Sequence, residues 1–183
     1  MTKYPVIAAV KNKEEFQQAL ETPVETIFHL TPNILSLKKE IDLAHACGKK
    51  LLMHIDFAEG IGKDRCGVLF SKKLGVDGII STRVNMIKIA RELGLFTVQR
   101  FFIVDTRSVD TTVESLKSSK ADMIEVMPGV VPKVIKTLKE RISVPIIAGG
   151  LIQSAAEVRS ALDGGAAAVS TGSQALWNRN EEN

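Results

Sequence analysis

The order of apolar runs and amphipathic stretches constrains the fold of this chain more than any other feature of its sequence. Short runs of apolar and β-branched residues alternate with segments whose apolar residues recur at helical spacing. Successive runs start 19 to 27 residues apart, which leaves room for one strand, one helix and two short loops each time. The sequence therefore predicts eight βα units with parallel strands. Their strands are expected to start near Val6, Thr26, Leu51, Gly78, Thr97, Met123, Pro145 and Ala167.

Several of the expected helices have recognisable ends. Asn12 precedes Glu15 by three residues, a spacing typical of a helix start. An asparagine also precedes each of two further expected helices, over 34–46 and 86–93. Glycines that follow apolar stretches suit the left-handed residue that closes a helix. The expected closing glycines are Gly48, Gly75, Gly94 and Gly164.

Eight such units can close into a barrel or form an open, doubly wound sheet. The open sheet usually binds a dinucleotide through Gly-x-Gly-x-x-Gly after its first strand, but Lys11-Asn12-Lys13 occupies that place here. The cluster Gly60-Ile61-Gly62 has Arg65 where the third glycine would stand. We therefore expect residues 1–183 to form a single-domain, compact (β/α)8 TIM-type barrel. Because 183 residues is below the usual ~200, one helix is expected to be missing or vestigial.

Composition excludes several classes of protein. With 45% hydrophobic and 25% charged residues, the chain can form a core and an ordinary polar surface. Its apolar stretches are far shorter than the roughly 18 residues of a membrane span, so no membrane partner is expected. Cys47 and Cys66 belong to no Cys/His cluster, which favours the reducing cytoplasm. The net charge of +3 favours anionic partners only slightly.

The last two strand ends of the expected barrel contain glycines. Function in this fold gathers at the carboxyl ends of the strands. Residues 145–150 end the seventh strand, and residues 169–173 end the eighth before a short helical turn at 174–177. Either stretch alone is an ordinary glycine turn, but together they favour a phosphate cradle of backbone amides and a hydroxyl. The expected phosphate-binding residues are Gly149, Gly150, Thr171 and Gly172.

Polar residues also mark the third expected strand. The two-residue period of a strand places His54 and Asp56 on one face, which we expect to point into the barrel mouth. A hydrogen-bonded core histidine is the alternative for His54. Glu59 could complete a metal or general-acid set, but no second histidine has the right spacing. We expect no metal, no cofactor and no catalytic residue.

Two further strand residues carry charge where apolar neighbours predict burial. Glu125 lies within an apolar strand and needs a partner, and Arg100 on the preceding strand is expected at a similar height. Such a pair is structural, or it holds the hydroxyls and phosphate of a ligand. Lys11, at the end of the first strand, is either a further anion contact or a solvated lysine.

Taken together, these motifs resemble the glycerol-3-phosphate-responsive antiterminator proteins over residues 5–177. The resemblance implies a non-enzymatic bacterial regulator that senses glycerol 3-phosphate. It also implies binding to the leader mRNA of a glycerol-utilisation operon and read-through of a terminator. The motifs are Ile7-Ala8-Ala9-Val10-Lys11, His54-x-Asp56-x-x-x-Gly60, Gly78-Ile79-Ile80-Ser81-Thr82, Gln99-Arg100-x-Phe102-x-x-Asp105, Ile124-Glu125-Val126-Met127-Pro128-Gly129, Ala148-Gly149-Gly150-x-Ile152 and the Thr171 turn before Trp177.

RNA binding rests on this resemblance, because the chain has one Tyr, one Trp and seven Phe, most of them placed to pack. The candidate RNA contacts are Lys63, Arg65 and Arg107, each of which could equally be a solvated side chain. The competing interpretation is an enzyme acting on a glycerol phosphate, such as a prenyltransferase or phosphodiesterase, using Asp56, Glu59 and Glu125. A structural barrel with an empty site is a third, and the oligomeric state stays open.

Overall fold

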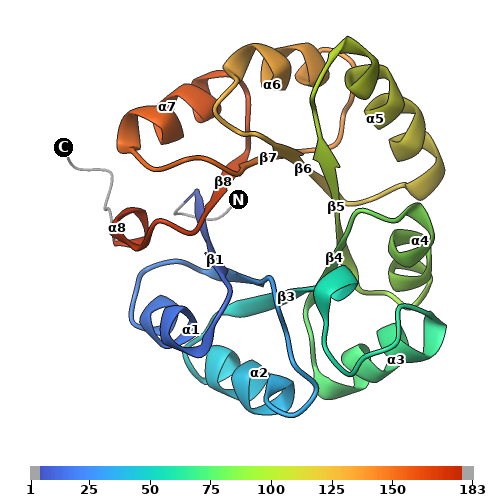
Figure 1. The fold of residues 1–183 in the computed structure, drawn as a ribbon, viewed down its shortest axis with the longest axis vertical. Coiled ribbons are helices and arrows are strands. Elements are labelled where there is room, and N and C mark those ends of the chain that lie inside the picture. Colours follow the sequence, from blue (N-terminus) through green and yellow to red (C-terminus); the bar gives the residue numbers. More distant parts are fainter. Residues whose placement is uncertain (1–4, 179–183) are drawn as a thin grey trace.

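A computed structural model of the chain describes residues 5–178, and within them eight parallel strands close into one barrel (Figure 1). Each strand pairs with the next in chain order, and β8 pairs with β1. Every strand starts within one residue of its predicted position, so the predicted TIM-type fold is confirmed. The strands are β1 (Val6–Val10), β2 (Thr26–His29), β3 (Lys50–His54), β4 (Gly78–Ser81), β5 (Phe96–Phe102), β6 (Met123–Met127), β7 (Ile146–Gly149) and β8 (Ala168–Thr171).

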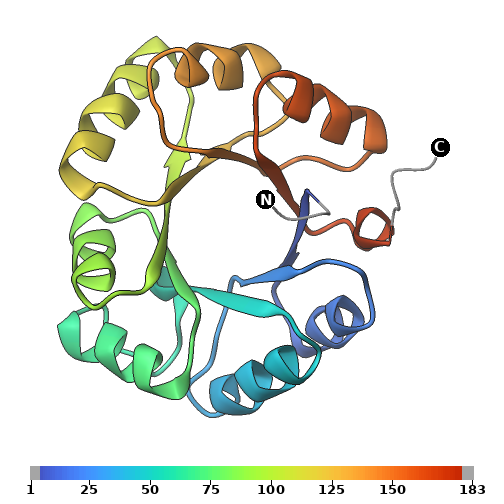
Figure 2. The same ribbon diagram turned by 180° about the vertical axis from the view of Figure 1, so that it is seen from behind.

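Helices form a ring outside the strands, as both views along the barrel show (Figures 1 and 2). The predicted reduced helix is α8, a single turn whose buried Trp177 donates its indole N–H to the Thr171 carbonyl at 2.8 Å. Between residues 5 and 178, no helix is long and apolar enough to cross a bilayer. The helices are α1 (Lys13–Leu20), α2 (Leu37–Ala46), the 3₁₀ turn η1 (Ile55–Phe57), α3 (Arg65–Leu74), α4 (Val84–Glu92), α5 (Thr106–Ser119), α6 (Pro132–Lys139), α7 (Ala155–Asp163) and α8 (Gln174–Trp177).

Some helix ends differ from the predicted ones. Asn12 caps α1 as predicted, because its side-chain oxygen accepts the Glu15 amide at 2.8 Å. In contrast, α2 begins at Leu37 rather than at residue 34, because Asn33 forms a β-bridge with Glu59 instead of capping a helix. This bridge ties the β2–α2 loop to the β3–α3 loop at the barrel mouth.

Two other boundary predictions need correction. Asn85 lies inside α4, whose first residue is Val84. Gly164 has a φ of −68°, and the left-handed residue that follows α7 is Gly165, with a φ of +103°. The other three predicted closing glycines have positive φ angles, as expected.

The interior of the barrel is apolar toward the amino ends of its strands and polar toward their carboxyl ends. On β5 and β6, the inward residues Val98 and Met123 contribute to the apolar plug. Two residues later on the same faces stand Arg100 and Glu125. The plug therefore confines the polar side chains to the mouth. Its buried members are Ile7, Ala9, Phe28, Leu52, Ile80, Val98, Ile147 and Ala168.

Candidate functional site

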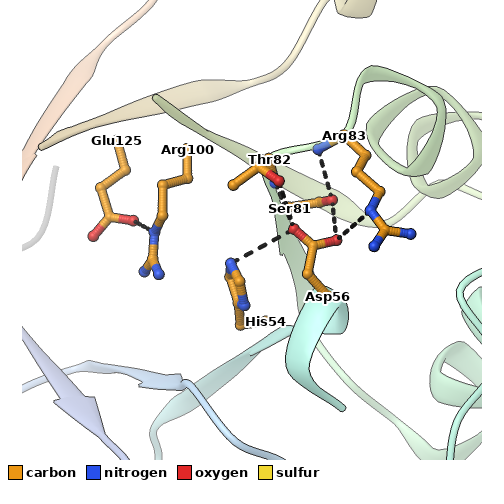
Figure 3. Close-up of polar contacts among 7 residues, drawn as sticks. All are labelled: His54, Asp56, Ser81, Thr82, Arg83, Arg100 and Glu125. Carbon is orange, nitrogen blue, oxygen red and sulfur yellow. Dashed lines mark hydrogen bonds and ion pairs between the residues drawn. The ribbon is translucent and has the colours of Figure 1, made fainter. Parts of the chain in front are cut away.

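An ion pair between β5 and β6 forms the centre of the mouth (Figure 3). Arg100 and Glu125 are register partners, and Arg100 Nε donates to Glu125 Oε2 at 2.5 Å, which confirms the predicted pairing. Glu125 is completely buried, and its other oxygen accepts a hydrogen bond from the Ser170 hydroxyl. Arg100 Nη2 is also buried and has no hydrogen-bond partner among the described residues. The charges of the pair therefore balance, but the Nη2 N–H groups of Arg100 remain available as donors.

A cavity of about 620 Å³ lies at the mouth between this pair and the last two strand ends. Six of the nine residues predicted to bind ligand line it, and Gly149, His54 and Asp56 do not. Ser173 and Gln153 also line it, although neither was predicted to bind. The six are Lys11, Arg100, Glu125, Gly150, Thr171 and Gly172.

The β7–α7 loop forms one wall of the cavity with an unusual backbone. Gly150 has a φ of +76°, and Leu151 follows with a φ of +63°, a conformation that a branched residue rarely adopts. The amides of Gly150 and Gly172 have no acceptor within residues 5–178. Free amides at the end of β7 and β8 are what the predicted phosphate cradle requires.

The hydroxyl that the sequence assigns to this cradle has another role in the structure. Thr171 Oγ1 donates to the Ile152 carbonyl at 2.7 Å and accepts the Ser173 amide at 3.0 Å. Its proton is therefore already used. The Ser173 hydroxyl lines the same cavity and has no partner in the described part of the chain. Ser173 is thus the better-placed hydroxyl donor.

Gly149 does not line the cavity, but it leaves space for the ion pair. A Cβ at this position would lie 2.5 Å from Glu125 Oε1 and 2.7 Å from Ser170 Oγ. Only a residue without a side chain leaves space for both groups. Spacing along the strand could have indicated this, because Gly149 pairs with Ser170 on β8.

His54 is enclosed at the end of β3. Its ring is fully buried and stacks on Phe57 with 4.8 Å between centroids. Neither ring nitrogen has a hydrogen-bond partner among residues 5–178. Burial, together with the positive charge of Arg100, lowers its pKa to about 4, although Asp56 acts in the opposite direction. His54 is therefore neutral at neutral pH.

Asp56 does not belong to β3, because the strand ends at His54 and η1 follows. Its carboxylate oxygens lie 3.8 Å from His54 Nε2 and 3.8 Å from Arg83 Nε. The expectation that the strand continues through Asp56 is wrong. Its carboxylate accepts hydrogen bonds from the Ser81 hydroxyl at 2.7 Å and from the Thr82 amide and hydroxyl at 2.8 and 2.9 Å (Figure 3). Burial alone would raise the pKa of Asp56, but these hydrogen bonds lower it overall. Asp56 thus fastens η1 to the β4–α4 loop.

The remaining predicted residues occupy separate positions on the loops. Glu59 accepts a hydrogen bond from the Asn33 side chain, and no cluster of three potential metal-binding side chains occurs in the described part. Lys63 donates to the Ala58 and Ile61 carbonyls of its own loop. The other two predicted RNA contacts differ: Arg65 pairs with Glu92 at 2.7 Å, and the exposed Arg107 side chain has no partner within the described residues.

Comparison with known proteins gives a consistent result. Residues 6–177 match the family model described as glycerol-3-phosphate responsive antiterminator. The uncharacterized protein YgcP of Escherichia coli K12 is 36% identical over 174 residues, which cover 94% of this chain and 91% of that protein.

Solved structures agree with the family match. The glycerol uptake operon antiterminator regulatory protein of Listeria monocytogenes is 31% identical, with a TM-score of 0.91, covering 97% of this chain and 96% of that one. A glycerol uptake operon antiterminator-related protein of Thermotoga maritima is also 31% identical, with a TM-score of 0.85, covering 95% and 98%. QR15, an aldolase, has a TM-score of 0.77 at 14% identity and shares only the fold.

Proposed function

Because the chain belongs to the glycerol-3-phosphate responsive antiterminator family, we propose that it is a cytoplasmic regulator that binds glycerol 3-phosphate and a leader mRNA. Ligand binding would promote read-through of a terminator ahead of a glycerol-utilisation operon. The family match supports the regulatory role, and the two similar antiterminator structures support it independently.

The two-sided mouth cavity is the observation that carries the ligand half of this proposal. On one side, the free amides of Gly150 and Gly172 with the Ser173 hydroxyl suit a phosphate. The Lys11 side chain, which has no partner among residues 5–178 and lines the same cavity, can add a positive charge there. On the other side, the balanced Arg100–Glu125 pair offers a donor and acceptors without net charge. Hydroxyl groups fit such a surface better than a second anionic group does.

A regulator without turnover also agrees with the placement of the carboxylates. The competing enzyme would need Asp56, Glu59 and Glu125 to act together. In the structure Asp56 contacts Ser81, Thr82, Arg83 and His54. Glu59 is bonded to Asn33, and Glu125 is bonded to Arg100 and Ser170. No contact among the described residues joins any two of these three carboxylates, so nothing in that part of the structure draws them into one catalytic set.

Replacing Gly150 by leucine is expected to weaken glycerol 3-phosphate binding at least about tenfold. Its Cβ would stand beside Met127 at 3.5 Å, on the cavity wall, and the longer side chain would occupy the ligand space. Gly94→Leu is the matched control, because Gly94 has nearly the same φ (+74° against +76°) but lies outside the cavity. Calorimetry should show lost affinity only in the Gly150 variant. Equal affinities in both variants would contradict this phosphate position.

Glu125→Gln is expected to weaken glycerol 3-phosphate binding more than inorganic phosphate binding. The amide keeps one acceptor but loses the charge that holds Arg100 in place. Glu40→Gln provides a control, because Glu40 is a buried carboxylate bonded to His29 away from the cavity. Competition titrations with both ligands measure the ratio. Equal losses for the two ligands would place the polyol elsewhere.

The RNA half is tested with a leader transcript of a glycerol-utilisation operon from the same genome. A mobility-shift titration and a single-round transcription assay, each with and without glycerol 3-phosphate, should show tighter binding and more read-through with ligand. Turnover of glycerol phosphates, assayed with and without magnesium, should be absent. Turnover without RNA binding would favour the enzyme.

A further inference from the structure

The two most exposed aromatic side chains in the described residues lie on the same face of the barrel. Phe57, the last residue of η1, is 63% exposed, and Phe102, the last residue of β5, is 60% exposed. Both stand at the carboxyl ends of strands, on the side where the ligand cavity opens. Phe16 and Phe28, in contrast, are almost completely buried. The two exposed rings therefore contribute little to the core.

Phe57 is held in one orientation despite its exposure. Its ring stacks on His54 with 21° between the ring planes, so one face is covered and the other is open. The backbone on either side is fixed, because Asp56 bonds to β4 and the Ala58 amide donates to the Ile55 carbonyl. An aromatic ring fixed in this way loses little conformational entropy when a flat partner stacks on it.

Arginine side chains alternate with these rings. Arg83 follows β4, which lies between β3 and β5 in the barrel (Figure 1), and its side chain is 56% exposed. Arg107 is the second residue of α5, after β5, and its side chain is exposed without a partner within residues 5–178. Because β3, β4 and β5 are neighbours in the barrel, the two rings and the two arginines lie at the carboxyl ends of three adjacent strands. We call Phe57, Arg83, Phe102 and Arg107 the mouth strip.

The carboxylates of the same loops are occupied by helix starts and hydroxyls. Asp64 and Asp105 cap α3 and α5, and Asp56 bonds to Ser81 and Thr82. The oxygens of Asp64 and Asp105 therefore face backbone amides, and Asp56 also lies 3.8 Å from Arg83 Nε (Figure 3). Arg107 is therefore the outward charge without a carboxylate partner among residues 5–178, and Arg83 remains 56% exposed beside Asp56. Both guanidinium groups can reach a polyanion.

We propose that the mouth strip binds an unpaired segment of leader RNA, with bases stacked on Phe57 and Phe102 and phosphates on Arg83 and Arg107. Single-stranded RNA is recognised by stacking on aromatic side chains and by arginine contacts to its backbone. The proposal rests on the proposed function, because it assigns the RNA partner to a surface. It also explains how ligand and RNA are linked, since Phe102 follows Arg100 by two residues on β5.

The test compares RNA affinity of wild type, Phe57→Ala, Phe102→Ala and Arg107→Ala at saturating glycerol 3-phosphate. Phe96→Ala is the matched aromatic control, because Phe96 is 43% exposed at the opposite end of β5. Arg159→Ala, an exposed arginine on α7, is the matched basic control. The probe is the leader transcript, and circular dichroism with calorimetric ligand binding establishes that each variant is folded.

Each phenylalanine variant should bind the transcript at least about fivefold more weakly, while both controls bind like wild type. Arg107→Ala should reduce the slope of log affinity against log salt by about 0.7. Wild-type binding that both phenylalanine variants retain would overturn the mouth strip and leave the proposed function standing. A wild-type protein that binds ligand but no transcript would overturn the proposed function as well. Loss of self-association with unchanged RNA affinity would assign the strip to a contact between copies.

Discussion

Arg100→Met is expected to lower the free energy of unfolding by about 3–5 kcal/mol. The substitution leaves the Glu125 carboxylate fully buried, with only the Ser170 hydroxyl as a partner. An uncompensated buried charge costs far more than an intact pair contributes, because its desolvation is no longer offset. Urea denaturation of wild type and variant at pH 7 measures the difference.

The double variant Arg100→Met/Glu125→Met separates stability from function. With both charges removed, its stability should return to within about 1 kcal/mol of wild type, while glycerol 3-phosphate binding is lost. Arg141→Met is the matched control: its ion pair with Asp110 is exposed, so its loss should cost about 1 kcal/mol or less. A double variant as unstable as the single one would show that the pair itself, rather than the orphaned charge, stabilises the barrel.

His54→Leu is expected to remove much of the acid sensitivity of the protein. The pKa of buried His54 is about 4, against an ordinary value of 6.5. Between these values the unfolded chain takes up a proton that the folded chain does not, so wild-type stability falls as the pH falls from about 6.5 to about 4. A difference of this size corresponds to about 3 kcal/mol.

Unfolding free energies at pH 7 and pH 4 test this expectation. Relative to wild type, the leucine variant should gain about 3 kcal/mol on going from pH 7 to pH 4. At pH 7 both proteins have an uncharged side chain at this site. The difference between their unfolding free energies at pH 7 therefore reports the change in packing alone. A wild type and variant with parallel stability curves over this range would rule out the buried neutral histidine. Asp56 titrates below its ordinary value, so its contribution falls at still lower pH.

The sequence determined the barrel and the central ion pair of the mouth. The strand starts could be predicted from the alternation of apolar runs. A parallel strand is buried on both faces, so its residues form a continuous apolar run that is visible in the sequence. The meeting of Arg100 and Glu125 followed from strand order and a two-residue period alone. These features depend on neighbours in sequence or on adjacent strands, so a pattern is enough to predict them.

Only the tertiary structure decided where side chains point once a strand has ended. Asp56 leaves the face of β3 because the strand ends at His54 and η1 follows, and Ser81 and Thr82 supply its hydrogen-bond donors. In the same way, the Thr171 proton is taken by the Ile152 carbonyl. Such partners come from loops distant in sequence, and no local periodicity encodes them.

Exposure of the loop side chains was also decided by the tertiary structure. Phenylalanine is usually buried, yet Phe57 and Phe102 lie at the rim of the barrel and are largely exposed. Lys63 and Arg65, two of the candidate RNA contacts from the sequence, bind a pair of loop carbonyls and Glu92, respectively. Burial depends on how much surface the packed helices and loops cover. That quantity is fixed only when the whole chain has folded.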